Sequence, residues 1–103
     1  MEQSPTPSIA DLNDAFRKTC EPFLTPGILF LPALDSLLQA VREYDEFTPE
    51  NDPYGEHDFG VLGWYNERVL WKIDYYDQMH TYGEDPLSPE CQRVLTIMTG
   101  DEY

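Results

Sequence analysis

Residues 48–60 have the sequence TPENDPYGEHDFG, in which turn-forming prolines and glycines are mixed with four acids and a histidine. A histidine beside carboxylates has two common uses, as a ligand set for a divalent metal and as a general acid or base. His57 and Asp58 are the candidates here, and Asp74 and His80 follow the next apolar stretch. A metal-binding or hydrolytic site of His57, Asp58, Asp74 and His80 is therefore kept as the alternative function.

The spacing of these residues matches no strong metal or catalytic motif. The chain contains no HExxH, CxxC, complete EF-hand loop, GxSxG or Gly-rich phosphate loop. Its two cysteines, Cys20 and Cys91, are far apart and lie near apolar residues, as expected of small buried side chains in a reducing compartment. We expect no metal, no cofactor and no catalytic residue.

Charge is the strongest global signal, because 20 Asp and Glu residues face six Lys and Arg residues, for a formal net charge of −14. A surface this acidic repels nucleic acid and anionic membranes, and the six cations form no basic stripe. It attracts basic protein surfaces instead, at rates that fall with added salt. We therefore expect a protein partner, with no direct nucleic-acid or membrane binding. Solubility alone is the other explanation of the acidity.

The acids are dense between Arg42 and Arg68, a window without a single Lys or Arg. In an extended chain, acids at alternate positions lie roughly 6–7 Å apart, which is close to the phosphate spacing of a nucleic-acid strand. Such a row suits a non-enzymatic protein that blocks a basic nucleic-acid-handling protein by imitating DNA. The predicted partner-binding residues are Glu50, Asp52, Glu56, Asp58, Asp74, Tyr76 and Asp77.

Other residues of the segment have the chemistry of turns and anchors. We interpret Pro53, Tyr54, Gly55, His57 and Phe59 as structural residues of this loop, with His57 forming a hydrogen bond that holds it still. Aromatic residues with an acidic rim are typical of a protein-binding hot spot, and the same face would suit a homodimer.

The first half of the chain contains two amphipathic patterns that predict helices. Ser8 and Asp11 form a capping pair before apolar residues at helical spacing, which predicts a helix over residues 9–20. Pro32 and the Leu-rich pattern after it predict a second helix over residues 32–44. A short apolar run between them predicts a strand over residues 27–30.

The second half predicts a hairpin and a last helix. Alternation places strands at about residues 59–65 and 69–76, with Asn66 and Glu67 at the turn. Ser88 as a cap and Pro89 at the first position predict a helix that Gly100 ends. The order α-β-α-β-β-α predicts an α+β domain over residues 8–103, a small antiparallel sheet with helices packed on one face. Residues 1–7 are expected to form a flexible tail.

The N-terminal sequence lacks the basic and apolar regions of a signal peptide, and no apolar run approaches the length of a membrane span. We expect a soluble, cytoplasmic protein.

The motifs LNDAFR, FTPENDPYGEHDFG, WKIDYYD and RVLTIM with a terminal EY resemble a family of small uncharacterised proteins. This domain of unknown function is associated mainly with alphaproteobacteria and their mobile elements. The resemblance runs from Leu12 to Tyr103 and implies that residues 51–59 matter, with Trp71, Lys72, Asp74, Tyr75, Tyr76 and Asp77. It implies no activity. The link to mobile elements makes an anti-restriction or anti-CRISPR inhibitor the expected form of the acidic protein. Family members often have Gly in the hairpin turn, where this chain has Asn66 and Glu67, so the turn type stays open.

Overall fold

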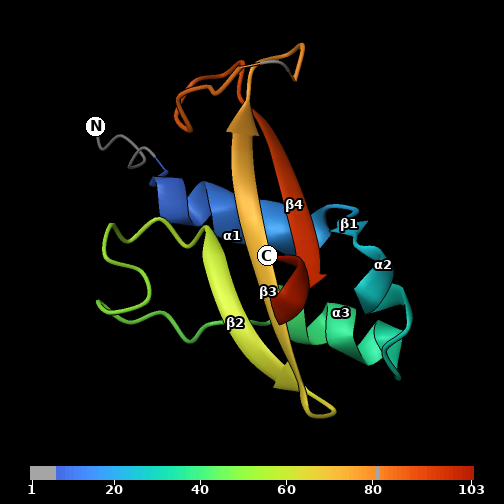
Figure 1. Cartoon of the computed structure of the whole chain (residues 1–103). Coiled ribbons are helices and arrows are strands. Elements are labelled where there is room, and N and C mark those ends of the chain that lie inside the picture. The colour runs from blue at the N-terminus through green and yellow to red at the C-terminus, as the bar shows by residue number, and fades with distance from the viewer. Residues whose placement is uncertain (1–6, 81) are drawn as a thin grey trace.

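The computed structural model describes residues 7–80 and 82–103, so the tail predicted for residues 1–7 lies almost entirely outside the described part. A four-stranded sheet with the strand order β1-β4-β3-β2 forms the centre of the molecule (Figure 1). The elements in chain order are α1 (Ile9–Thr19), β1 (Phe23–Leu24), α2 (Pro26–Leu29), α3 (Leu34–Arg42), β2 (Phe59–Trp64), β3 (Glu67–Tyr76), β4 (Gln92–Thr99) and the 3-10 helix η1 (Gly100–Glu102).

The α+β class is confirmed, because α1 and α3 pack on one face of this sheet while η1 lies on the other (Figure 1). Strands β2, β3 and β4 are antiparallel, as predicted, whereas the short β1 runs parallel to β4. The sheet is therefore mixed. None of the helices in the described part of the chain is long and apolar enough to cross a membrane.

The capping pair predicted at the start of α1 is present in the structure. The Ser8 hydroxyl accepts from the Asp11 N–H at 3.0 Å, and the Asp11 carboxylate accepts from the Ser8 N–H at 3.1 Å. This reciprocal capping satisfies two of the N–H groups that a helix start leaves unpaired. The second predicted helix is also present, although α3 is shorter than predicted and begins after Ala33, whose φ is +55°.

The predicted strand at residues 27–30 is wrong, because this segment belongs to the short helix α2 and the turn after it. Pro26 occupies the first position of α2, where its fixed φ suits a helix and its missing N–H costs nothing. The extended residues are the preceding pair, Phe23 and Leu24, which form β1.

The predicted C-terminal helix is also wrong, because residues 92–99 form β4. Ser88 and Pro89 lie instead in a turn, in which the Cys91 N–H donates to the Ser88 carbonyl at 3.1 Å. The segment is rich in β-branched residues, and an eight-residue register with β3 uses every one of its positions. Pairing with β3 therefore makes this segment a strand, although its apolar spacing also fits a helix.

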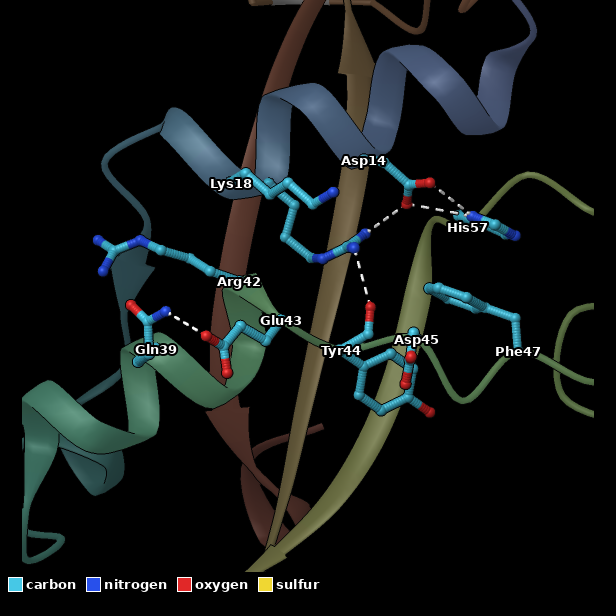
Figure 2. Close-up of a pocket in the computed structure, with 10 residues that line it drawn as sticks. Asp14, Lys18, Gln39, Arg42, Glu43, Tyr44, Asp45, Phe47 and His57 are labelled. Carbon is cyan, nitrogen blue, oxygen red and sulfur yellow. Dashed lines mark hydrogen bonds and ion pairs between the residues drawn. The ribbon is translucent and has the colours of Figure 1, made fainter.

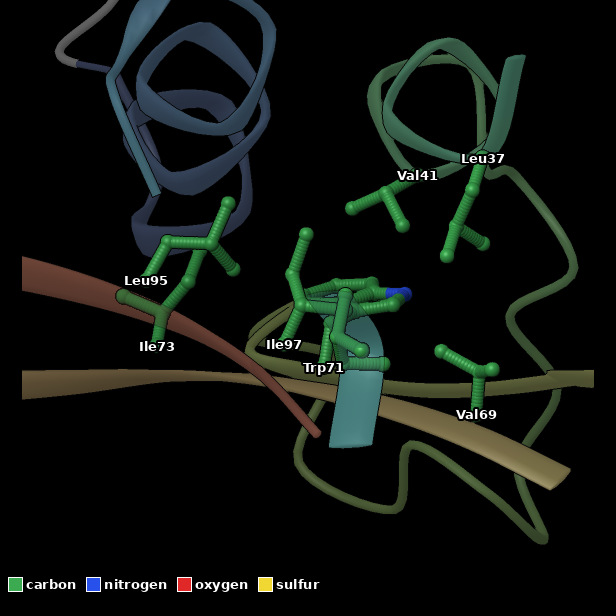
Figure 3. Close-up of a cluster of buried hydrophobic side chains, with 8 residues drawn as sticks. Leu37, Val41, Val69, Trp71, Ile73, Leu95 and Ile97 are labelled. Carbon is green, nitrogen blue, oxygen red and sulfur yellow. The ribbon is translucent and has the colours of Figure 1, made fainter. Parts of the chain in front are cut away.

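The core lies between the sheet and the two long helices (Figure 3). Alternation along β3 holds as predicted, because Val69, Trp71 and Ile73 are buried on the helix-covered face. Leu37 and Val41 of α3 reach down onto this face. The hairpin turn sits one residue earlier than predicted, at Tyr65 and Asn66, whose φ values are +48° and +67°. Two successive positive φ values are the geometry of a type I′ turn.

The C-terminus is fastened to α2 by Glu102. Its carboxylate accepts from the Thr25 hydroxyl at 2.6 Å, the Gly27 N–H at 3.0 Å and the Thr99 N–H at 3.0 Å. These hydrogen bonds, led by the one from Thr25, lower the pKa of Glu102 from 4.5 to about 2.

Glu102→Gln is expected to lower the melting temperature at neutral pH and to flatten its acid dependence. The pKa of Glu102 is lower in the folded chain, so its contribution is present above the ordinary value of 4.5 and disappears as the pH falls toward about 2. Thermal melts across this pH range measure the difference. Glu90→Gln, at an exposed position, is the control, and equal pH profiles for the two variants would contradict the assignment.

Candidate functional site

The acidic loop, residues 43–58, connects α3 to β2 and is folded back on itself by turns. The Asp52 N–H donates to the Thr48 carbonyl at 2.8 Å, and the Gly55 N–H donates to the Asp52 carbonyl at 3.0 Å. Gly55 has a φ of +63°, which suits glycine. The premise that Glu50 and Asp52 lie along an extended chain is therefore wrong.

Asp52 is turned into the protein, with only 7% of its side chain exposed. Its carboxylate accepts from the backbone N–H of Glu56 at 3.1 Å and from that of His57 at 3.3 Å. His57 has a left-handed backbone with a φ of +56°. Such a conformation is uncommon for a residue other than glycine, and the hydrogen bonds that the Asp52 carboxylate accepts support it.

The His57 side chain ties the acidic loop to α1. Its Nδ1 lies 3.0 Å from an Asp14 carboxylate oxygen, and its Nε2 lies 3.7 Å from an Asp52 oxygen. The ring also stacks on Phe47, with a centroid separation of 3.8 Å and an interplanar angle of 4°. Both ring nitrogens thus face carboxylates of the protein itself.

Arg17 is the buried centre of this arrangement, with a relative exposure of 2%. Its guanidinium donates to the carbonyls of Val41 and Tyr44, both at 3.0 Å, and to Asp14 at 2.9 Å. The same group lies over the ring of Trp71, 5.0 Å from its centroid. Arg17 therefore joins α1, the end of α3 and the acidic loop in one network.

A groove of about 730 Å³ opens above this network, between α1 and the end of α3 (Figure 2). Lys18, Arg42 and Asp45 are among the residues around it. Its lining contains no Ser, Thr or Cys that could act as a nucleophile.

A second network holds the far end of the acidic loop. Asn13, which is fully buried, donates to the Glu56 carbonyl at 2.9 Å and to the Tyr75 hydroxyl at 2.8 Å. Arg93 donates to the Asn13 side-chain oxygen at 2.6 Å, and the Tyr75 hydroxyl donates to the Glu56 carboxylate at 3.3 Å. Burial raises the pKa of Tyr75, so its hydroxyl remains a donor.

Four of the predicted partner-binding acids form an acidic cluster: Asp52, Glu56, Asp58 and Asp74. Burial raises the pKa of Asp58, and the negative charges of the other three raise it further. Lys72 forms an ion pair with Asp74 at 3.1 Å. The fold thus brings β3 and the acidic loop together and places carboxylates where they repel one another.

The remaining predicted residues are not among these four acids. Glu50 is exposed, Tyr76 lies beside the His80 ring with centroids 6.1 Å apart, and an Asp77 carboxylate oxygen accepts from the Met79 N–H. Pro53 is exposed and Tyr54 is 86% exposed. Phe59 contacts Tyr103 across the face that carries η1.

Of the alternative site, Asp58 and Asp74 interact electrostatically. Across residues 7–80 and 82–103, no group of three or more His, Cys, Asp and Glu residues is placed to hold a metal ion. His57 contacts α1 through Asp14, whereas His80 lies in the loop beyond β3, next to Tyr76.

Sequence reasoning missed Asn13, Asp14, Arg17 and Phe47, which hold the acidic loop in place. One signal was available: polar residues in α1 recur four apart at Asn13 and Arg17, so they share one face of the helix. All three α1 residues also lie within the LNDAFR motif.

A family model described as "Protein of unknown function (DUF3768)" matches residues 6–102. The chain belongs to this family. The DUF3768 match covers both networks and the acidic cluster, so the whole site lies within the family domain. No curated protein and no solved structure matches the chain.

Proposed function

We propose that this DUF3768 protein is a non-enzymatic acidic interaction protein that binds a basic surface of a nucleic-acid-handling protein. The supporting observation is that burial raises the pKa of Asp58 and the negative charges of Glu56, Asp52 and Asp74 raise it further. Like charges held together in the free protein gain stabilisation when a cationic partner approaches. A binding surface thus accounts for an arrangement that is unfavourable for folding alone.

The overall charge supports the same function. Six Lys and Arg residues can neutralise at most six of the 20 acids, and Arg17 is buried with its charge directed at Asp14. The acidic surface would displace nucleic acid from its partner by occupying the same cations. The imitation would be of a compact anionic surface and not of an extended phosphate row. An inhibitor of a restriction or CRISPR complex is one form of this function.

Asp58→Asn is expected to stabilise the free protein at neutral pH while weakening its binding to the partner. A raised carboxyl pKa contributes stability below the unfolded-state value, and this contribution is lost as the pH rises through the folded-state value. Removing the charge should therefore raise the melting temperature by a few degrees at pH 7. The control is Glu21→Gln, which changes an exposed residue directly before Pro22 and should leave the melting temperature unchanged.

Capture from a bacterial lysate tests the binding half of the proposal. A variant carrying Glu50→Gln, Asp58→Asn and Asp74→Asn should lose the partner. The changes at Asp58 and Asp74 remove charge from the acidic cluster, and the change at Glu50 removes charge from an exposed position of the acidic loop. The matched control carries Glu21→Gln, Asp35→Asn and Glu90→Gln, which remove the same charge from exposed positions elsewhere. The control should retain the partner.

The captured protein must also bind nucleic acid and release it when the DUF3768 protein is added in a gel-shift assay. Capture should weaken steeply as NaCl rises from about 0.1 M to about 1 M, because the Debye length falls from about 10 Å to about 3 Å. A partner that survives high salt, or that both triple variants retain equally, would refute the proposal.

A further inference from the structure

Strand β2 is a sheet edge with a free row of backbone groups. It ends the order β1-β4-β3-β2, and its one-to-one register with β3 contains no bulge. The Ile73 N–H donates to the Asp58 carbonyl at 2.8 Å, so hydrogen-bonded pairs fall at every second residue from Asp58. The N–H and C=O groups of Phe59, Val61 and Gly63 therefore point away from the sheet. Within the described residues, no backbone bond outside the strands involves them.

The strand β2 itself, as the structure describes it, lacks the sequence features that normally protect an exposed edge. Edge strands are usually short, bulged, interrupted by Pro or charged, which prevents pairing with another chain. The opposite edge follows this rule, because β1 has only two residues. In contrast, β2 has six residues, FGVLGW, with no charge and no Pro. A Cβ atom added at Gly63 would meet nothing within 4 Å, and Tyr65 at the turn is 64% exposed.

We propose that β2 is a docking edge to which an extended basic segment of the partner protein adds as a fifth strand. This inference rests on the proposed function and specifies how the partner is held. The docked segment would bond through its main chain to Phe59, Val61 and Gly63, which is the strand-addition mode of peptide recognition.

Charge selects the kind of segment that fits this edge. Asp58 and its acidic cluster precede the uncharged strand, whereas Glu67 after the turn is followed by Arg68, which lies opposite Gly63 and balances its charge. A segment with a β-branched or apolar centre and Lys or Arg at the end beside Asp58 complements this pattern. A second copy of the chain does not, because each copy has a net charge of −14.

The probe for the test is a short capped peptide with a Thr and Val centre and Lys residues at one end. Its control is the same peptide N-methylated at every internal backbone nitrogen, which keeps the charge and removes the donors. NMR titration and amide hydrogen exchange should show that the first peptide protects the N–H groups of Phe59, Val61 and Gly63. The methylated peptide should bind roughly tenfold more weakly or worse, because several ladder hydrogen bonds are lost.

Two variants of the protein sharpen the test. Val61→Pro removes an outward N–H while leaving the β3 ladder intact, and should weaken the first peptide roughly tenfold. Val61→Thr retains the N–H and the β-branched shape, and should bind as the wild type does. If Val61→Pro does not fold, the exchange protection in the wild-type protein decides the question.

Three results would overturn the inference. Equal affinity for both peptides would show that the peptide binds by its charge alone and forms no backbone hydrogen bonds with β2. The proposed function would then survive, whereas strand addition would be refuted. Protection of acidic-cluster residues alone would lead to the same conclusion. Protection of the β2 amides that rises with protein concentration and needs no peptide would assign the edge to a homodimer. Failure of the proposed function is recognised separately, by equal partner capture with both triple variants.

Discussion

Replacing Arg17 with Met is expected to lower the free energy of unfolding by about 3 kcal/mol, because the change leaves the acceptors of its hydrogen bonds without a donor. The guanidinium is 2% exposed and satisfies the carbonyls of Val41 and Tyr44 and the carboxylate of Asp14. Met retains most of the packing of the side-chain stem but offers no donor. Urea denaturation followed by circular dichroism measures the loss as a lower midpoint.

Two further variants separate charge from geometry at this position. Arg17→Lys retains the positive charge but not the planar fork that reaches three acceptors, so an intermediate loss is expected. Lys18→Met changes the adjacent, exposed residue of the same helix and should alter stability by less than about 0.5 kcal/mol. If Arg17→Met proved as stable as Lys18→Met, the buried network would contribute nothing to folding.

Gly60→Ala is expected to lower the free energy of unfolding by about 2–3 kcal/mol, because Trp71 occupies the space above Gly60. A methyl group there would lie 2.6 Å from Cε2 and 2.8 Å from Cζ2 of the indole. Trp71 is fully buried against α3 and cannot move aside without disturbing the core. Thermal and urea unfolding measure the loss, and near-UV circular dichroism reports the displaced indole.

Gly63 supplies a matched control in the same strand. A Cβ atom added there meets nothing within 4 Å, so Gly63→Ala should not destabilise the folded state. It should be neutral or slightly stabilising, because alanine lowers the conformational entropy of the unfolded chain. A loss at Gly63 equal to that at Gly60 would show that the effect comes from the strand backbone and not from Trp71.

Local signals predicted the parts of the fold that depend on nearby residues. The capping pair before α1 and the alternation along β3 are complete within one turn or one strand, and both hold in the structure. In residues 91–99, which contain β4, Cys91, Val94, Leu95 and Met98 fit helical spacing, whereas Thr96, Ile97 and Thr99 favour a strand. Pairing with β3 decides between helix and strand, and the sequence of this segment alone does not determine that pairing.

The site was less predictable because its contacts are distant in sequence. The partner of His57 is Asp14, 43 residues away, and Arg17 bonds to carbonyls 24 and 27 residues away. Charge counting identified Asp52, Glu56, Asp58 and Asp74, which the fold does bring together. It could not indicate that Asp52 and Glu56 would turn inward to hydrogen-bond within the protein, since only the folded loop directs them there.

The place of β4 in the sheet has a consequence for biosynthesis. Strand β4 is synthesised after β1, β2 and β3 and lies between β1 and β3, so until β4 has emerged β1 has no strand partner and β3 has only β2. Glu102, which fastens the C-terminus to α2, emerges later still. The nascent chain therefore waits with unpaired strands, a state that favours contact with chaperones. A stop codon before Gln92 would remove an inner strand of the sheet and not merely an edge strand.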